Sequence, residues 1–111
     1  MKYTHTIENG ILFINFTSDL LGATDSLELM DFINDTINQG IHKAVVNMKE
    51  VRYMNSSGIG VLITIYTKFK NRNGDAVIVN PSDQIVKLLT MTKLDTVVKI
   101  YKDEAEALSK F

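Results

Sequence analysis

The chain has 111 residues, the usual size of one folded domain, and 45% of them are hydrophobic. Its 12 basic and 13 acidic side chains give a formal net charge of -1, which argues against binding nucleic acid through a basic surface. The absence of cysteine excludes disulfides, thiolate zinc sites and a cysteine nucleophile. We therefore expect a single α/β domain, residues 1–111, without a cofactor.

The N-terminal stretch "MKYTHTIENG" lacks the apolar core of a signal peptide, and no run of about 18 apolar residues follows it. These features predict a cytoplasmic protein that inserts no segment into a membrane. The nearly neutral charge, without a nucleotide or metal motif, predicts a monomer or weak dimer.

A β-hairpin is predicted at the start of the chain. Residues 2–8 and 11–16 read as strands, and Asn9-Gly10 between them is the strongest short hairpin signal. Helical spacing follows over residues 22–39, where Thr24 or Asp25 is a candidate cap and Gly40 a candidate terminator. The apolar positions of this helix at steps of three and four are Leu27, Met30, Ile33 and Ile37.

Strands and helices alternate in the rest of the chain. We expect strands at residues 44–48, 75–79 and 97–100, and helices at residues 58–70, from Ser82 and from Asp103. Repeated β-α-β units imply a parallel sheet, and the opening hairpin adds an antiparallel edge strand. The fold class is therefore α/β with a mixed sheet.

The segment "YMNSSGIGVL" joins the strand at residues 44–48 to the following helix, at the sheet edge where ligands usually bind. Ser57 is a candidate cap of that helix. Gly58 and Gly60 have no side chain to cover the backbone. This lets a partner or a phosphate approach closely, or it allows the helix to pack tightly against the sheet. On both interpretations, we expect Gly60 to tolerate no larger side chain.

Three enzymatic motifs fail at this segment: the G-x-S-x-G nucleophile elbow, the P-loop and the G-x-G-x-x-G fingerprint. With no base or metal cluster beside the serines, we expect no enzyme. The helix ends in Lys68, Lys70 and Arg72, which complement the helix dipole or contact an acidic partner.

Residues 44–108 resemble the STAS domain of bacterial anti-sigma factor antagonists. The most specific piece is "MNSSGIGVL", which is similar to the family's D-S-S-G-[LI]-G, and "VIVNPS" and "TKLDTVVKIY" also correspond. The resemblance implies a single STAS-like domain, with about four helices packed mainly on one face of the mixed sheet.

The resemblance also implies a function in signal transduction and transcription regulation. Such antagonists bind an anti-sigma factor that is often a serine kinase. This kinase phosphorylates the serine before the glycine, here Ser57, and the phosphorylated antagonist then dissociates from the anti-sigma factor. A phosphatase removes the phosphate and restores binding. Asn55 and, in our alignment, Leu21 replace two acidic residues of the family. The alternative is a non-phosphorylated STAS subunit or scaffold of a larger assembly, such as a lipid ABC transporter or a signalling complex.

The implied partner surface surrounds the start of the second helix, because the carboxyl ends of neighbouring parallel strands meet at one edge of a sheet. Its predicted residues are Leu21, Gly22, Ala23, Asn55, Ser56, Ser57, Gly58 and Ile59.

Overall fold

The computed structural model describes residues 2–21 and 26–111, so that the predicted caps Thr24 and Asp25 lie outside the described residues. Its strands are β1 (Tyr3–Glu8), β2 (Ile11–Phe16), β3 (Lys43–Asn47), β4 (Asp75–Val79) and β5 (Ile100–Tyr101). Its helices are α1 (Ser26–Asn38), α2 (Ser56–Lys70), α3 (Asp83–Met91) and α4 (Glu104–Lys110), with a short 3₁₀ turn η1 (Leu94–Thr96). The order is the predicted one, but β5 begins three residues after the predicted 97 because η1 precedes it.

The five strands form one sheet in the order β1-β2-β3-β4-β5. β1 pairs antiparallel with β2, and the other neighbours pair parallel, which confirms the mixed sheet. In the hairpin turn, Asn9 has a φ of 53° and Gly10 a φ of 77°. These left-handed conformations are what a two-residue turn requires when it follows the twist of its strands, so the Asn-Gly prediction is confirmed.

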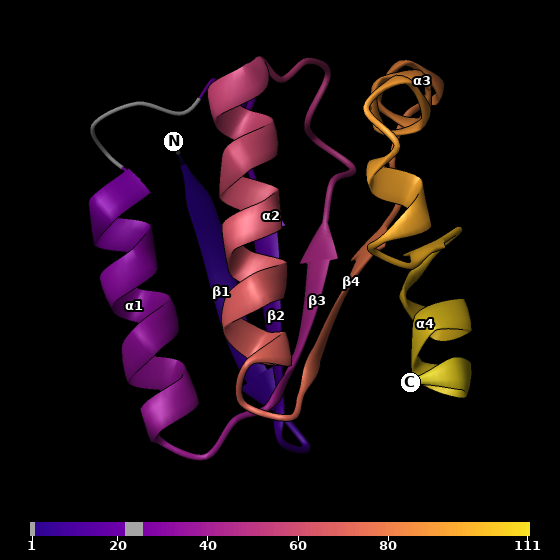
Figure 1. Ribbon diagram of the computed structural model, residues 1–111. Helices are drawn as coiled ribbons and strands as arrows, with labels where there is room; N and C mark the ends of the chain where they lie inside the picture. The colour runs from indigo at the N-terminus through magenta and orange to yellow at the C-terminus, as the bar shows by residue number, and fades with distance from the viewer. Residues whose placement is uncertain (1, 22–25) are drawn as a thin grey trace.

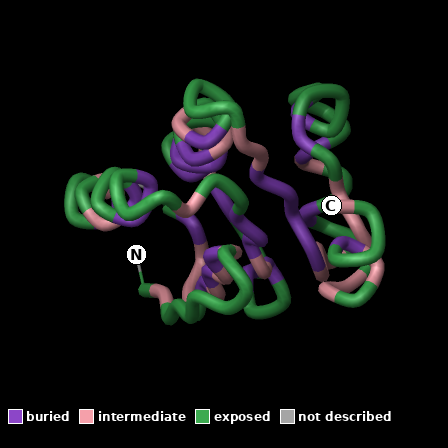
Figure 2. The backbone as a smooth tube through the Cα atoms, turned by 90° about the horizontal axis from the view of Figure 1, so that it is seen from below, coloured by how far each residue is buried: buried purple, intermediate pink, exposed green. Residues whose placement is uncertain are grey.

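The sheet has two differently covered faces, because successive side chains of a strand point to opposite sides. Leu12, Ile14, Val46 and Ile78 face the main core, which also contains buried residues of α1, α2 and α3. Figure 1 shows α1 and α2 on this face, and Figure 2 shows the buried segments between these helices and the strands. The other face carries a smaller cluster of Val45, Val77 and Val79 with Ala107 of α4. Helices packed mainly on one face are therefore confirmed.

The buried stripe of α1 differs from the predicted one. Leu29, Ile33 and Ile37 are buried at steps of four, but Leu27 is 73% exposed. Leu27 is six residues from Ile33, which places it about 120° round a helix with 3.6 residues per turn. The helix ends as predicted, since Gly40 has a φ of 96°.

A short turn from α2 into β4 orients α2 against the sheet. The N–H of Gly74 donates to the carbonyl of Phe69 at 2.9 Å, and the N–H of Asp75 donates to the carbonyl of His42 at 3.0 Å. The end of α2 is thereby held where β4 begins, so its first turn lies at the opposite, carboxyl edge of the strands (Figure 1).

At that edge the segment after β2 lies against the segment before α2. The N–H of Leu20 donates to the carbonyl of Tyr53 at 3.1 Å, and the N–H of Asn55 donates to the carbonyl of Leu20 at 3.2 Å. Leu20 and Met54 form a parallel bridge, and both side chains are buried. Backbone pairing therefore joins the two segments, as expected from the strand order.

Gly58 permits this contact, because a Cβ added to it would lie 1.9 Å from the carbonyl oxygen of Leu20. A Cβ on Gly60 would have no neighbour within 4 Å. The expectation that Gly60 tolerates no larger side chain is therefore wrong. The physical reason is that two residues correspond to about 200° of rotation, which turns Gly60 away from the segment that Gly58 contacts.

We predict opposite effects of one methyl group at these two glycines. Gly58→Ala forces backbone apart and should lower the free energy of unfolding by about 1–3 kcal/mol or more. Gly60→Ala, the matched control, should raise it by up to about 1 kcal/mol through helix propensity. Urea unfolding followed by circular dichroism measures both, and equal stability of the two variants would contradict the close approach at Leu20.

Candidate functional site

The start of α2 is capped by Asn55 and not by Ser57. The Asn55 side chain accepts a hydrogen bond from the N–H of Gly58 at 2.9 Å, with φ -97° and ψ -175°. The helix thus begins at Ser56, two residues before the predicted start. An asparagine side chain caps as well as an aspartate does, because its carbonyl oxygen accepts the same N–H. The interpretation of Ser57 as the cap is therefore wrong.

Ser56 and Ser57 are the first two residues of α2, and both are exposed. Neither hydroxyl has a hydrogen-bond partner among the residues that the structure describes. The first N–H groups of a helix have no carbonyl within the helix to donate to, and they carry a partial positive charge. The surface thus combines two free hydroxyls with backbone donors, and its first turn contains no acidic side chain.

Asp19 organises the neighbouring segment, a role that the sequence did not suggest. Its Oδ1 accepts hydrogen bonds from the N–H of Arg52 at 2.9 Å and of Tyr53 at 3.2 Å. A carboxylate therefore remains beside the segment that leads into α2, although Leu21 occupies the aligned acidic position. The available signal was its place in a short polar stretch after a strand, where aspartate side chains often bind backbone N–H groups.

Exposed or half-buried apolar side chains lie on the segments next to the two serines. Leu21 is 52% exposed and Tyr53 is 47% exposed, and Ile59 is half-buried. Gly58 is buried, so its role at the site is to let the backbone of α2 approach the backbone of Leu20 closely. Tyr53 was not among the predicted partner residues, although the sequence shows an aromatic residue next to the serine segment. Of the other predicted partner residues, Gly22 and Ala23 lie outside the described residues.

The described part of the chain holds no group of three or more histidine, aspartate or glutamate residues that could bind a metal ion. Within the same residues, no helix is long and apolar enough to cross a membrane. The described surface at the start of α2 consists of exposed hydroxyls, backbone N–H groups and apolar side chains.

Proteins named as anti-sigma factor antagonists are similar to this chain in sequence. The Paenibacillus polymyxa protein named anti-sigma F factor antagonist is 24% identical over 101 residues, which cover 91% of this chain and 86% of that protein. A Listeria monocytogenes anti-sigma-B factor antagonist is 30% identical over 61 residues, covering 55% of this chain and 54% of the relative.

Among solved structures, SpoIIAA in its unphosphorylated form superposes with a TM-score of 0.81 at 18% identity, covering 98% of this chain and 95% of that one. The phosphorylated form of Bacillus SpoIIAA gives 0.72 at 20% identity and covers 98% of both chains. These likenesses show a shared fold. The family model described as the STAS domain matches residues 3–107, nearly the whole chain, and the chain therefore belongs to the STAS domain family.

Proposed function

We propose that this protein is an anti-sigma factor antagonist of the cytoplasm, which binds an anti-sigma factor with serine kinase activity through the start of α2. Phosphorylation of Ser57 ends the interaction, and a phosphatase restores it. Support comes from relatives that carry the antagonist name and from SpoIIAA, a protein of the same fold that has a phosphorylated form.

The observation that carries the proposal is the free hydroxyl of Ser57. Because Asn55 caps α2, Ser57 is left exposed with no hydrogen bond to a described residue. A kinase needs a serine whose hydroxyl reaches its active site, and a capping serine would have to give up its bond to the backbone first. The cap at Asn55 thus leaves the hydroxyl of Ser57 available for modification.

The fold should tolerate a phosphate at Ser57. A phosphoserine adds a charge of about -1.5 to -2, and at a helix N-terminus this charge contributes roughly 0.3–1 kcal/mol of stabilisation. No acidic side chain in the first turn of α2 opposes it, and the cap is a neutral amide. The switch therefore needs no change in the structure of the domain.

A bound partner should not tolerate the same phosphate. Leu21, Tyr53 and Ile59 lie on the segments next to the serines and are exposed or half-buried, so a partner that packs on them and on the start of α2 removes water from Ser57. Taking an unpaired ion out of water costs several kcal/mol. A loss of about 2.8 kcal/mol corresponds to a hundredfold weaker affinity, so desolvation alone would release the partner.

We predict that Ser57→Ala binds the kinase-type anti-sigma factor of its own genome constitutively, whereas Ser57→Asp binds it about a hundredfold more weakly. Both variants should melt close to the wild-type temperature, because Ser57 is exposed and its hydroxyl has no hydrogen bond to a described residue. Isothermal titration calorimetry measures the affinities. Incubation with that kinase and ATP, followed by peptide mass spectrometry, should place one phosphoryl group on Ser57.

Ser56→Ala is the matched control, since Ser56 is equally exposed one residue earlier. It should still gain one phosphoryl group on Ser57, so it is a control for the site of phosphorylation. If the wild type gains no phosphoryl group and Ser57→Asp binds with full affinity, the switch is wrong and the scaffold alternative remains.

A second prediction concerns the apolar rim of the site. Leu21→Asp should weaken partner binding at least about tenfold, since burying an unpaired carboxylate in an interface is unfavourable. Leu108→Asp is the control, because Leu108 is 46% exposed but lies on α4, which covers the other sheet face. Surface plasmon resonance compares the two. Equal affinities would place the partner surface elsewhere.

A further inference from the structure

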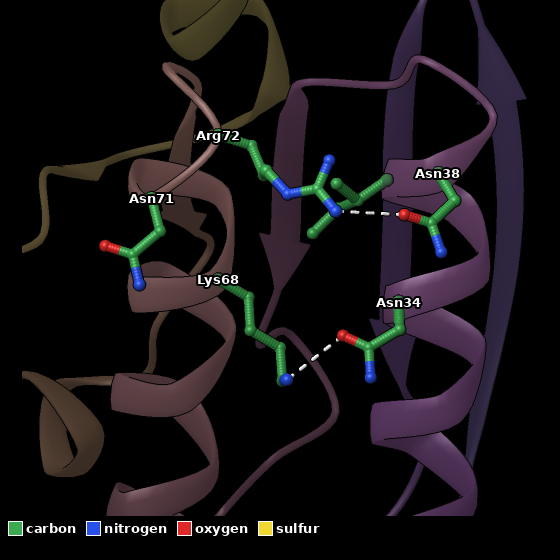
Figure 3. Close-up of a pocket in the computed structure, with 6 residues that line it drawn as sticks. Asn34, Asn38, Lys68, Asn71 and Arg72 are labelled. Carbon is green, nitrogen blue, oxygen red and sulfur yellow. Dashed lines mark hydrogen bonds between the residues drawn. The ribbon is translucent and has the colours of Figure 1, made fainter.

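A pocket of about 340 Å³ lies between the C-terminal halves of α1 and α2, at the opposite end of α2 from Ser57. Figure 3 shows the side chains of Lys68 and Arg72 extending from the end of α2 across to α1. The residues that line the pocket are Asn34, Ile37, Asn38, Lys68, Asn71 and Arg72.

Both cations of this pocket are hydrogen-bonded to neutral amides. Lys68 Nζ donates to Asn34 Oδ1 at 3.0 Å, and Arg72 Nη2 donates to Asn38 Oδ1 at 3.0 Å (Figure 3). Neither has a carboxylate partner within ion-pair distance among the described residues. Two positive charges therefore share one pocket without a counter-charge.

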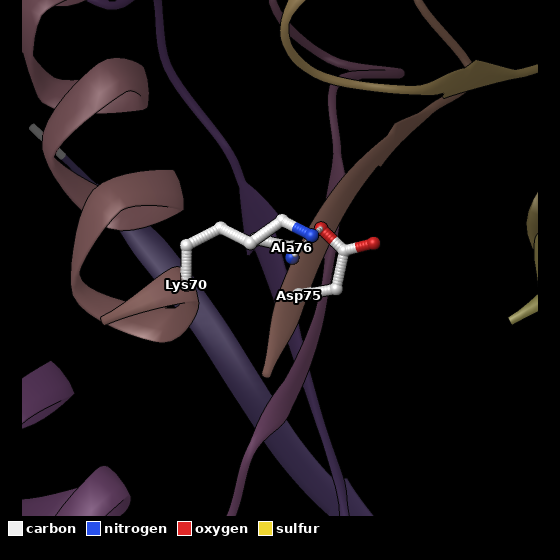
Figure 4. A network of polar contacts seen from close by, with 3 residues as sticks. All are labelled: Lys70, Asp75 and Ala76. Carbon is white, nitrogen blue, oxygen red and sulfur yellow. Dashed lines mark hydrogen bonds and ion pairs between the residues drawn. The ribbon is translucent and has the colours of Figure 1, made fainter. Parts of the chain in front are cut away.

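The neighbouring Lys70 shows what an ordinary structural cation does in this region. Its Nζ lies 3.7 Å from Asp75 Oδ1, an ion pair that bridges the turn from α2 to β4 (Figure 4). The same carboxylate oxygen accepts the N–H of Ala76 at 2.9 Å. Lys70 is thus compensated within the fold, and Lys68 and Arg72 are not.

Complementing the dipole of α2 does not account for the pocket. A cation in that role lies near the terminal carbonyls of its own helix. The side chains of Lys68 and Arg72 instead cross to side chains of α1, and no hydrogen bond joins either charged group to a carbonyl of α2 in the described residues. Their charged groups are held over the space between the two helices.

Most of the hydrogen-bonding capacity of these cations remains available. An ammonium group has three donors and a guanidinium group has five, and Asn34 and Asn38 each use one. A guanidinium binds two phosphate oxygens side by side, and a lysine adds a point charge. An anion would therefore add to the contacts with Asn34 and Asn38 without displacing them.

We propose that this pocket is a second binding site of the domain, which takes a small anion with one or two phosphate groups. Its volume is at the lower end for small-molecule sites, enough for a diphosphate with part of an attached organic group. Lys68 is 11 residues from Ser57, or about 16 Å along the helix axis. The site is therefore separate from the start of α2 and does not depend on the proposed switch.

The test is a titration of the ¹⁵N-labelled full chain with inorganic pyrophosphate, at ionic strength held constant with sodium chloride. We expect saturable chemical-shift changes centred on the pocket residues of α1 and α2. Adenosine diphosphate should shift the same residues, because its two phosphates present the same chemistry. Lys68→Gln and Arg72→Gln, which keep an N–H donor for the asparagines, should each weaken binding about tenfold or more.

Lys70→Gln is the control on the same helix and should leave the affinity unchanged. Ser57→Asp should also leave it unchanged, which separates this site from the switch. Shifts that do not saturate, an equal loss in Lys70→Gln, or shifts centred on residues 56–59 would each overturn the proposal. Melting curves of each variant confirm that a lost affinity does not come from unfolding.

Discussion

The candidate site depends on the contact between Leu20 and the segment that enters α2. Two backbone hydrogen bonds join Leu20 to Tyr53 and Asn55, and they continue the pairing of β2 with β3 beyond the strands. A backbone carbonyl approaches Gly58 at this point more closely than any side chain would allow. Because both segments are held by main-chain groups, the exposed side chains around them are free to differ without changing the frame.

Of the three residues before Gly58, only Asn55 makes the capping hydrogen bond of α2. Asn55 satisfies the helix N–H at Gly58, so the two serines that follow need not do so. Asp19 satisfies two further N–H groups at residues 52 and 53. A free hydroxyl at a helix start thus results from neighbours that take over the capping and turn bonds. Chemical modification of such a hydroxyl changes the charge of the surface and leaves these bonds in place.

α2 also connects two chemically different surfaces. Its first turn presents hydroxyls and backbone donors, whereas Lys68 near its end and Arg72 just beyond it reach to amide side chains of α1 and have no carboxylate partner among the described residues. Its middle is fixed by the buried residues Val61, Leu62 and Ile65. A helix packed in this way holds both ends in a constant relation to the sheet, so that events at one end need not disturb the other.

Features of this protein that depend on neighbouring residues in the chain could be read from the sequence. Backbone preferences predict the Asn9-Gly10 turn, the end of α1 at Gly40 and the helix caps at Ser82 and Asp103. Hydrophobic periodicity predicts the order of strands and helices. Only the tertiary structure decided whether Gly58 or Gly60 must lack a side chain and which cations lack a carboxylate partner. Gly58 and Gly60 are alike in sequence, and a backbone 38 residues away at Leu20 distinguishes them. Lys68 and Lys70 differ likewise because one faces α1 and the other faces Asp75, and such contacts arise only when distant segments pack together.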